Sequence, residues 1–463
     1  MKLLFGIQEL VWGPGLLFLF LGTGLASTLR LRGFQLLGFR RWWKATAGVF
    51  GSREKDAKSQ TATACTALAA TVGTGNIAGV ATALAAGGPG AVFWMWVSAF
   101  LGMATAYAEV YLGIRYRRQS GVPGRSGESG GAGGMAGCGP FFYLEDGLGW
   151  GRVSVLYALF CLLASLGMGS MVQANAIGDS INYAFSIPVP MAAVITTALA
   201  AAVILGGAKR ITAAAGILIP CSAGLYFFFG GIVVLSCFER IPAVLAEIFS
   251  QALNIKSAAG GAAGYTMAQA VRFGVARGVF SNEAGLGSLA VLHGTADADA
   301  RPEEQGMWAM FEVFFDTIVS CTLTALILLC MGESGGGSAA VASAFAGRFG
   351  VFGGWFTAVS MALFAFSSII AWFYLGKQAV EYVAVRLGGK GMEEKWPGRK
   401  MLGRRRAAET VYTACYVASV FLGCVGQLTI VWTISDIFNG LMAVPNLLGV
   451  LFLLKEVKLP EKK

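Results

Sequence analysis

Apolar runs long enough to cross a bilayer constrain this chain more than any other feature of its sequence. A membrane-spanning helix needs about 20 predominantly apolar residues, and such runs recur along the 463 residues. Charged residues make up 13% of the chain and the mean hydropathy is +0.66, whereas soluble proteins carry about 25% charged residues. The sequence therefore predicts an all-α polytopic membrane protein rather than a set of soluble domains.

We expect about 11 transmembrane helices from the positions of these runs. The predicted segments are 7–28, 62–87, 90–115, 152–182, 189–207, 211–237, 265–293, 306–332, 354–386, 408–426 and 430–454.

The lysines and arginines predict how these spans are oriented, because cytoplasmic loops carry an excess of positive residues. They concentrate in RLRGFQLLGFRRWWK, RYRRQSGVPGR, GAKR, RLGGKGMEEKWPGRKMLGRRR and KEVKLPEKK. If the N-terminus is outside, eleven spans place all five clusters on the cytoplasmic side. We therefore expect a multi-pass protein of the plasma (inner) membrane with an external N-terminus and a cytoplasmic C-terminus.

Several other classes of protein fit the composition poorly. The net charge of +10 comes from these loop clusters. A nucleic-acid-binding protein would need a basic face with groove-reading elements, and the sequence shows neither feature. The nine cysteines are scattered without a C-x-x-C pair, and His293 is the only histidine. This pattern argues against a structural zinc site or a disulfide framework.

The stretch VGTGNIAG at residues 72–79 allows three interpretations. A dinucleotide-binding turn would need a strand before the glycines and an acid about 20 residues later, and the chain has neither. Close packing of two helices through small residues would not explain Thr74 and Asn76 in the middle of a span. The third interpretation is a break in a membrane helix, where freed backbone groups bind a ligand.

A second glycine-interrupted segment, AVRFGVARGVFSNEAGLGS at 270–288, favours the third interpretation. Without the first span, each segment opens one half of the remaining ten, and the two halves enter the membrane from opposite sides. Paired interruptions of this kind are the best sequence indication of a secondary transporter's binding site. The predicted units are an N-terminal helix and basic loop (1–61), two five-helix repeats (62–237 and 265–454), an external loop (238–264) and a cytoplasmic tail (455–463).

Four stretches make the chain resemble the alanine/glycine:cation symporter family (sodium:alanine symporters, amino acid carrier proteins). They are TVGTGNIAGVATALAAGGPGAVFWMWVSAFLGMATAYAE, ARGVFSNEAGLGS, FAFSSIIAWFYLGKQAVEY and DIFNGLMAVPNLLGV. The resemblance implies a leucine-transporter-type (LeuT-type) fold, with a 5+5 inverted repeat plus one N-terminal helix. It also implies import of small neutral amino acids, chiefly alanine and glycine, coupled to sodium or to protons, with no cofactor.

The resemblance also assigns residues to the site. The substrate carboxylate would lie against the backbone of Thr74 and Gly75, with Asn76 reaching the substrate or ordering the break. Gln173 would contact the amino or carboxyl group, Phe273 and Gly274 would line the pocket near the second break, and Trp372 would close its side-chain end. Sodium would bind carbonyls near Ala69 and Val72 and the hydroxyls of Ser367 and Ser368, where the family commonly has Ser-Thr.

Other polar residues within the spans leave alternatives open. Arg272 and Arg277 either pair with Glu283 as a gate or form structural ion pairs. Asp316, four residues after Glu312, either supports a second cation or proton or is a hydrogen-bonded structural acid. Glu109 and Asp436 are equally ambiguous, and His293 is either a structural residue near a helix end or a proton shuttle.

We therefore predict a secondary active symporter that works by alternating access and is not an enzyme. Its expected partners are a small neutral amino acid, sodium and membrane lipid, and the protein is expected to be a monomer or a weak homo-oligomer. The alternatives are a carrier of the same fold for another small solute, proton coupling, and, less favoured, a channel or an intramembrane enzyme.

Overall fold

The computed structural model describes residues 2–50, 55–118, 137–253, 262–386 and 399–461. Apart from one isolated bridge between Arg118 and Gly137, the described residues form helices and their connections. The principal helices are α1 (Lys2–Val11), α2 (Pro14–Arg30), α5 (Lys55–Thr71), α6 (Val80–Gly87), α7 (Gly90–Arg115), α9 (Gly151–Ala164), α10 (Gln173–Phe185), α11 (Val189–Ile204), α12 (Gly207–Ser236), α15 (Ala262–Asn282), α16 (Ser288–Leu292), α17 (Pro302–Val313), α18 (Thr322–Met331), α20 (Val351–Arg386), α22 (Arg399–Val425) and α23 (Leu428–Leu453).

Each predicted span coincides with helical structure, and the all-helical membrane class is confirmed. Within the described residues, eight helices are long and apolar enough to cross a membrane, and a bent pair could make a ninth. The predicted span 189–207 is the shorter apolar helix α11, and 265–293 is divided between α15, α16 and a short 3₁₀ turn, η6 (His293–Thr295). The total of eleven spans and the inverted-repeat symmetry stay predictions. Parts of the predicted loops, at 51–54, 119–136, 254–261 and 387–398, lie outside the described residues.

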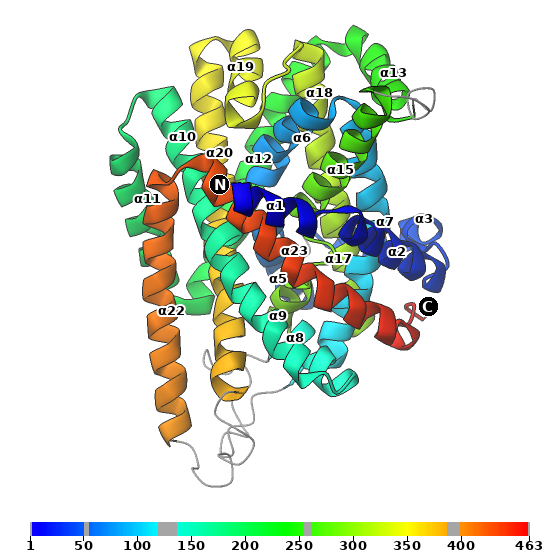
Figure 1. Cartoon of the computed structure of the whole chain (residues 1–463), viewed down its shortest axis with the longest axis vertical. Helices are drawn as coiled ribbons and strands as arrows, with labels where there is room; N and C mark the ends of the chain where they lie inside the picture. Colours follow the sequence, from blue (N-terminus) through cyan, green and yellow to red (C-terminus); the bar gives the residue numbers. More distant parts are fainter. Residues whose placement is uncertain (1, 51–54, 119–136, 254–261, 387–398, 462–463) are drawn as a thin grey trace.

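Several connecting helices lie at the two ends of the bundle, whereas α3 (Phe34–Leu37) lies on its side, next to α2 (Figure 1). Helices α13 (Ile241–Ala252) and α19 (Gly337–Phe349), which belong to predicted external loops, lie at one end (Figure 1). Helix α8 (Pro140–Phe142), the last turns of α20 and the first turns of α22 lie at the other end, where the sequence predicts cytoplasmic loops (Figure 1). This grouping agrees with the alternation of loops that the charge pattern predicts.

Two helices are interrupted inside the bundle. The first break separates α5 from α6, which are bent by 48° relative to each other, and it continues into a π-helical turn, η2 (Gly75–Gly79). The second break separates α15 from α16, and in it Glu283, Gly285 and Gly287 have φ values of 58°, 88° and 80°. Glycine adopts positive φ without a steric penalty, so the two glycines allow the chain to turn here.

Two further π-helical stretches lie in long spans that continue on either side of them. Stretch η4 (Ser165–Val172) joins α9 to α10, and η7 (Phe314–Cys321) joins α17 to α18. Such widened turns occur frequently at functional sites. The first break, η4 and η7 are therefore three irregular stretches inside the bundle.

The N-terminal helices cross the bundle and contact its last span (Figure 1). Gln8 Nε2 donates to Asp436 Oδ2 of α23 at 2.7 Å, and Trp12 Nε1 donates to the Asp436 carbonyl at 2.8 Å. Further along, the Arg30 side chain donates to the carbonyls of Leu454 and Val457 at 3.1 and 3.2 Å. The first and last parts of the described chain are therefore joined by side-chain hydrogen bonds.

Candidate functional site

The first break leaves backbone groups that side chains satisfy only in part. In a continuous helix the Gly73 amide would donate to the Ala69 carbonyl; here it donates to Asn76 Oδ1 at 3.0 Å. The Thr74 amide donates to Gln173 Oε1 at 3.3 Å. The Thr74 hydroxyl is buried and has no partner among the described residues. Two amides are thus held by neutral oxygens, and one hydroxyl remains to be satisfied.

The second break is completed by the protein itself. Glu109 of α7 accepts hydrogen bonds from the Gly285 and Gly287 amides at 3.2 and 3.1 Å. Asn446 of α23 donates to Glu109 at 2.8 Å and to the Gly285 carbonyl at 2.9 Å. A carboxylate of the protein therefore accepts from the freed amides of the second break. At the first break, no carboxylate of the described residues accepts from the Gly73 or Thr74 amide.

The two breaks lie against each other through Gly75. A Cβ atom on Gly75 would lie 2.9 Å from the Ser281 Cα of α15, two residues before Glu283. Only a residue without a side chain therefore allows this approach. The first break consequently touches α15 immediately before the second one.

Asn76 connects the first break to a buried acid. Its Nδ2 donates to Asp316 Oδ1 at 2.7 Å and to the Asp316 carbonyl at 3.0 Å. Thr317 donates to Asp316 Oδ2 at 2.8 Å and accepts from Asn282 Nδ2 at 3.0 Å. Asn76 thus joins Gly73 of the break to Asp316, which is held by neutral donors. Whether Asn76 orders the break or reaches the substrate stays a prediction.

The four residues of the predicted sodium site, Ala69, Val72, Ser367 and Ser368, are all buried. Ser368 is the nearer of the two hydroxyls, because a Cβ atom on Gly73 would overlap Ser368 Oγ. Ser367 and Ser368 both donate to the Phe364 carbonyl of their own helix, at 2.7 and 3.3 Å. The Gly73 amide donates to Asn76 Oδ1 instead of to the Ala69 carbonyl, so Ala69 has lost its helical partner at the break.

Trp372 is completely buried, and Glu283 holds its indole ring. The indole Nε1 donates to Glu283 Oε1 at 2.8 Å, which joins α20 to the second break. Gly169 in η4 packs against the base of the Trp372 side chain, since a Cβ there would overlap the Trp372 Cβ. Trp372 therefore contacts both the second break and η4, and its role in closing the substrate pocket stays a prediction.

The predicted location of Gly274 near the second break is wrong. Gly274 and Gly278 face α7, where added Cβ atoms would overlap the Ala91 carbonyl oxygen and Ser98 Oγ. This Gly-x-x-x-Gly spacing packs two helices closely, and α15 is continuous through it. Phe273, half-buried beside Arg272, lies on the same continuous helix, and the break begins only at Glu283.

The arginines of α15 form structural ion pairs, so the gate with Glu283 is wrong. Arg277 Nη2 lies 2.9 Å from Asp436 Oδ2 of α23 and stacks on the Trp432 ring. Arg272 lies 3.8 Å from Glu9 of α1. A single sequence does not show toward which neighbouring helix an arginine points. In the structure Arg272 points toward α1 and Arg277 toward α23.

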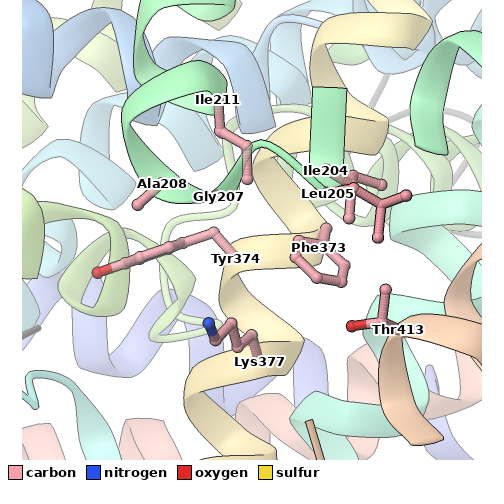
Figure 2. A pocket seen from close by; sticks show the side chains of 9 residues that line it. All are labelled: Ile204, Leu205, Gly207, Ala208, Ile211, Phe373, Tyr374, Lys377 and Thr413. Carbon is pink, nitrogen blue, oxygen red and sulfur yellow. The ribbon is translucent and has the colours of Figure 1, made fainter. Parts of the chain in front are cut away.

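A cavity of about 190 Å³ lies away from both breaks, between the α11–α12 turn and helices α20 and α22 (Figure 2). No residue of the predicted substrate or sodium site lines it. Lys377 on its wall pairs with Glu409 at 3.3 Å, and most of the remaining lining is apolar. Its lining residues are Ile204, Leu205, Gly207, Ala208, Ile211, Phe373, Tyr374, Lys377 and Thr413.

Discontinuous helices around a buried polar centre, inside a bundle of apolar helices, define the class of membrane transporters with broken spans. The model of the sodium:alanine symporter family matches residues 1–460, and the chain belongs to that family. It is therefore a member of a family of sodium-coupled amino acid symporters and not an enzyme.

Several relatives match nearly the whole chain. An uncharacterised transporter of Haemophilus influenzae is 39% identical, over 98% of this chain and 94% of the relative. A sodium/alanine symporter, AgcS, of Methanococcus maripaludis is 37% identical, over 96% and 93%. A probable sodium/glutamine symporter, GlnT, of Bacillus subtilis is 32% identical, over 97% and 87%. Among solved structures, a mutant manganese transporter of Eremococcus coleocola is 12% identical with a TM-score of 0.49, over 84% of this chain and 87% of that one.

Proposed function

We propose that this protein imports small neutral amino acids, chiefly alanine and glycine, together with sodium by alternating access. The observation that carries the proposal is the unequal occupation of the two breaks. Glu109 fills the second break with a carboxylate, whereas the Gly73 and Thr74 amides of the first break meet only neutral oxygens. A substrate carboxylate is a stronger acceptor for such amides than a neutral amide oxygen.

Gln173 gives the carboxylate a route into this position. Its bond to the Thr74 amide is long, at 3.3 Å, and its Nε2 donates to the Met168 carbonyl at 3.2 Å. We propose that the substrate carboxylate replaces Gln173 Oε1 at Thr74, and that the Thr74 hydroxyl donates to it. The predicted ligands Thr74, Gly75, Asn76 and Gln173 all lie at this break.

The size of the substrate is proposed to be set by Trp372. The ring is held in place by its bond to Glu283 and by the close approach of Gly169. A fixed indole at the end of the pocket would admit hydrogen or methyl side chains and would exclude larger ones by steric clash. Phe273 is proposed to line the pocket wall, whereas Gly274, which packs against α7, is not proposed for it.

Sodium is proposed to bind where the Ala69 carbonyl lacks its helical partner. Ala69 and Val72 would supply carbonyl oxygens, and Ser367 and Ser368 would turn their hydroxyls from the Phe364 carbonyl toward the ion. Oxygen-only ligands of this kind suit a hard cation. The same helix break would then bind the amino acid on one side and the coupling ion on the other. Binding of the substrate and binding of sodium would therefore depend on the same backbone segment.

In the cell we propose an orientation in the plasma membrane with the N-terminus outside and the C-terminus in the cytoplasm. The five basic clusters support it, as does the separation of α13 and α19 from α8 (Figure 1). Inward movement of a cation with the substrate can then draw on the membrane potential, about 2.3 kcal/mol for each charge per 100 mV.

The test is uptake of labelled alanine into proteoliposomes with and without an inward sodium gradient. We expect the gradient to stimulate uptake at least tenfold. The double variant S367A/S368A should lose this stimulation. Ser360→Ala should keep it, because the Ser360 hydroxyl lies on the same helix and has no hydrogen-bond partner among the described residues. Uptake that neither sodium nor protons stimulate would refute symport, and sodium-driven uptake of glutamine without alanine uptake would refute the proposed substrate.

A further inference from the structure

The only histidine of the chain lies in a buried polar contact that the proposed transport site does not use. His293 begins η6, immediately after α16, and its side chain is fully buried. Its Nδ1 lies 2.7 Å from Gln305 Oε1, and its Nε2 lies 3.1 Å from Glu312 Oε2. Both partners belong to α17, so the imidazole attaches the segment after the second break to that helix.

Each of the two contacts must contain a proton, and this requirement limits the possible states. A nitrogen lone pair facing a carboxylate is repulsive, so one proton always lies between His293 Nε2 and Glu312. At Nδ1 there are two possibilities. Either Nδ1–H donates to the Gln305 oxygen, or the Gln305 amide turns and its NH₂ group donates to an unprotonated Nδ1. The two arrangements differ by one proton on the His293–Glu312 pair.

The surroundings make that proton the main compensation for the charge of Glu312. The described ion-pair partner of Glu312 is His293, and the second carboxylate oxygen, Oε1, is buried and has no hydrogen-bond partner among the described residues. The other titratable groups facing the pair are Glu109 of α7 and Cys65 of α5. With the additional proton the pair is neutral overall, and without it the pair carries a buried negative charge, which is costly in this environment.

We propose that His293 and Glu312 form a proton-binding site that takes up or releases one proton as the Gln305 amide turns. The loaded form holds η6 firmly against α17, and release of the proton weakens that attachment. Glu312 lies one helical turn before Asp316, which binds Asn76 of the first break. The proton site therefore lies between η6, which follows the second break, and Asp316, which contacts the first break. Its link to transport rests on the proposed function.

A single histidine allows a direct measurement of this site. The full-length protein would be purified with a tag that contains no histidine, labelled with ¹⁵N-histidine and studied in nanodiscs by NMR. Its one imidazole gives two nitrogen signals, each of which reports whether that nitrogen carries a proton. Between about pH 5 and pH 8, where histidines titrate, we expect Nδ1 to lose its proton while Nε2 remains in its contact with Glu312.

Two variants on α17 separate the proposal from a purely structural role. Glu312→Gln removes the carboxylate and should abolish the Nδ1 transition in this pH range. Glu304→Gln is the matched control, because Glu304 lies on the same helix near the surface and pairs with Arg301; it should leave the transition unchanged. An Nδ1 that keeps one protonation state from about pH 5 to pH 8 in the wild type overturns the proposal. A transition that is unchanged in Glu312→Gln also overturns it.

The link to transport has a separate readout. The rate of alanine exchange across proteoliposomes should change at least threefold over the pH range of the NMR transition, and Glu312→Gln should flatten this profile. An NMR transition with identical exchange profiles in the two proteins would overturn the link. Absence of alanine transport by the wild type at every pH would instead refute the proposed function, while the NMR result would still decide whether the proton site exists.

Discussion

Replacing Asn76 by alanine tests whether the first break is ordered by its own side chain. Asn76 donates to the Asp316 carboxylate at 2.7 Å and to the Asp316 carbonyl at 3.0 Å, and it accepts from the Gly73 amide at 3.0 Å. A hydrogen bond to a charged group contributes about 1.5–3 kcal/mol and a neutral one about 1 kcal/mol. The three bonds together give about 4 kcal/mol, which corresponds to about three powers of ten in an equilibrium constant.

The expected result is a loss of the ordered break rather than a loss of the whole fold. Alanine affinity should fall by about a hundredfold or more, measured as binding of labelled alanine to purified protein. The apparent unfolding temperature should also fall. Asn182→Ala is the control, because Asn182 makes one exposed hydrogen bond, to the Ile187 carbonyl at 2.9 Å. An Asn76→Ala protein that binds alanine within threefold of wild type, with an unfolding temperature equal to that of Asn182→Ala, would refute the assigned role.

Three further substitutions test other contacts. Trp372→Ala should extend uptake to larger neutral amino acids, measured by competition with labelled alanine; an unchanged substrate range would remove Trp372 from the pocket. Gly376→Ala should destabilise the protein by about 1–3 kcal/mol through overpacking, because its Cβ would overlap the Tyr412 hydroxyl oxygen. Gly354→Ala, which meets nothing within 4 Å, should be neutral in the same thermal assay. Glu109→Gln should cost about 2–4 kcal/mol, since a side-chain amide cannot accept from two backbone amides and Asn446 together; equal unfolding temperatures for Glu109→Gln and wild type would contradict this account.

Features that repeat along the chain were predictable from its sequence. Apolar length and loop charge predicted the helical membrane class and the positions of the spans. The first break was predictable because Thr74 and Asn76 are polar residues among glycines in an apolar run. These local signals do not depend on knowing which helices are neighbours.

Contacts between distant segments could not be predicted in the same way. Glu109 completes a break 176 residues later in the chain, and Trp372 binds an acid 89 residues earlier. Nothing near either residue indicates its partner. The second break lies inside the predicted segment 270–288, near its end. Gly274 was expected to lie closer to it because glycines also pack helices together, as Gly274 does against α7, and spacing alone does not separate the two uses.

The contacts of Gln8 and Trp12 with Asp436 have a consequence for biosynthesis. Asp436 is made 428 residues after Gln8, so the first helix must wait in the bilayer, or with the insertion machinery, until almost all of the chain has been translated. Arg277 is likewise made long before its partner Asp436. A ribosome that stalls before α23 therefore releases a chain with an unpaired buried arginine and an undocked first helix, two features by which membrane quality control can identify an unfinished protein.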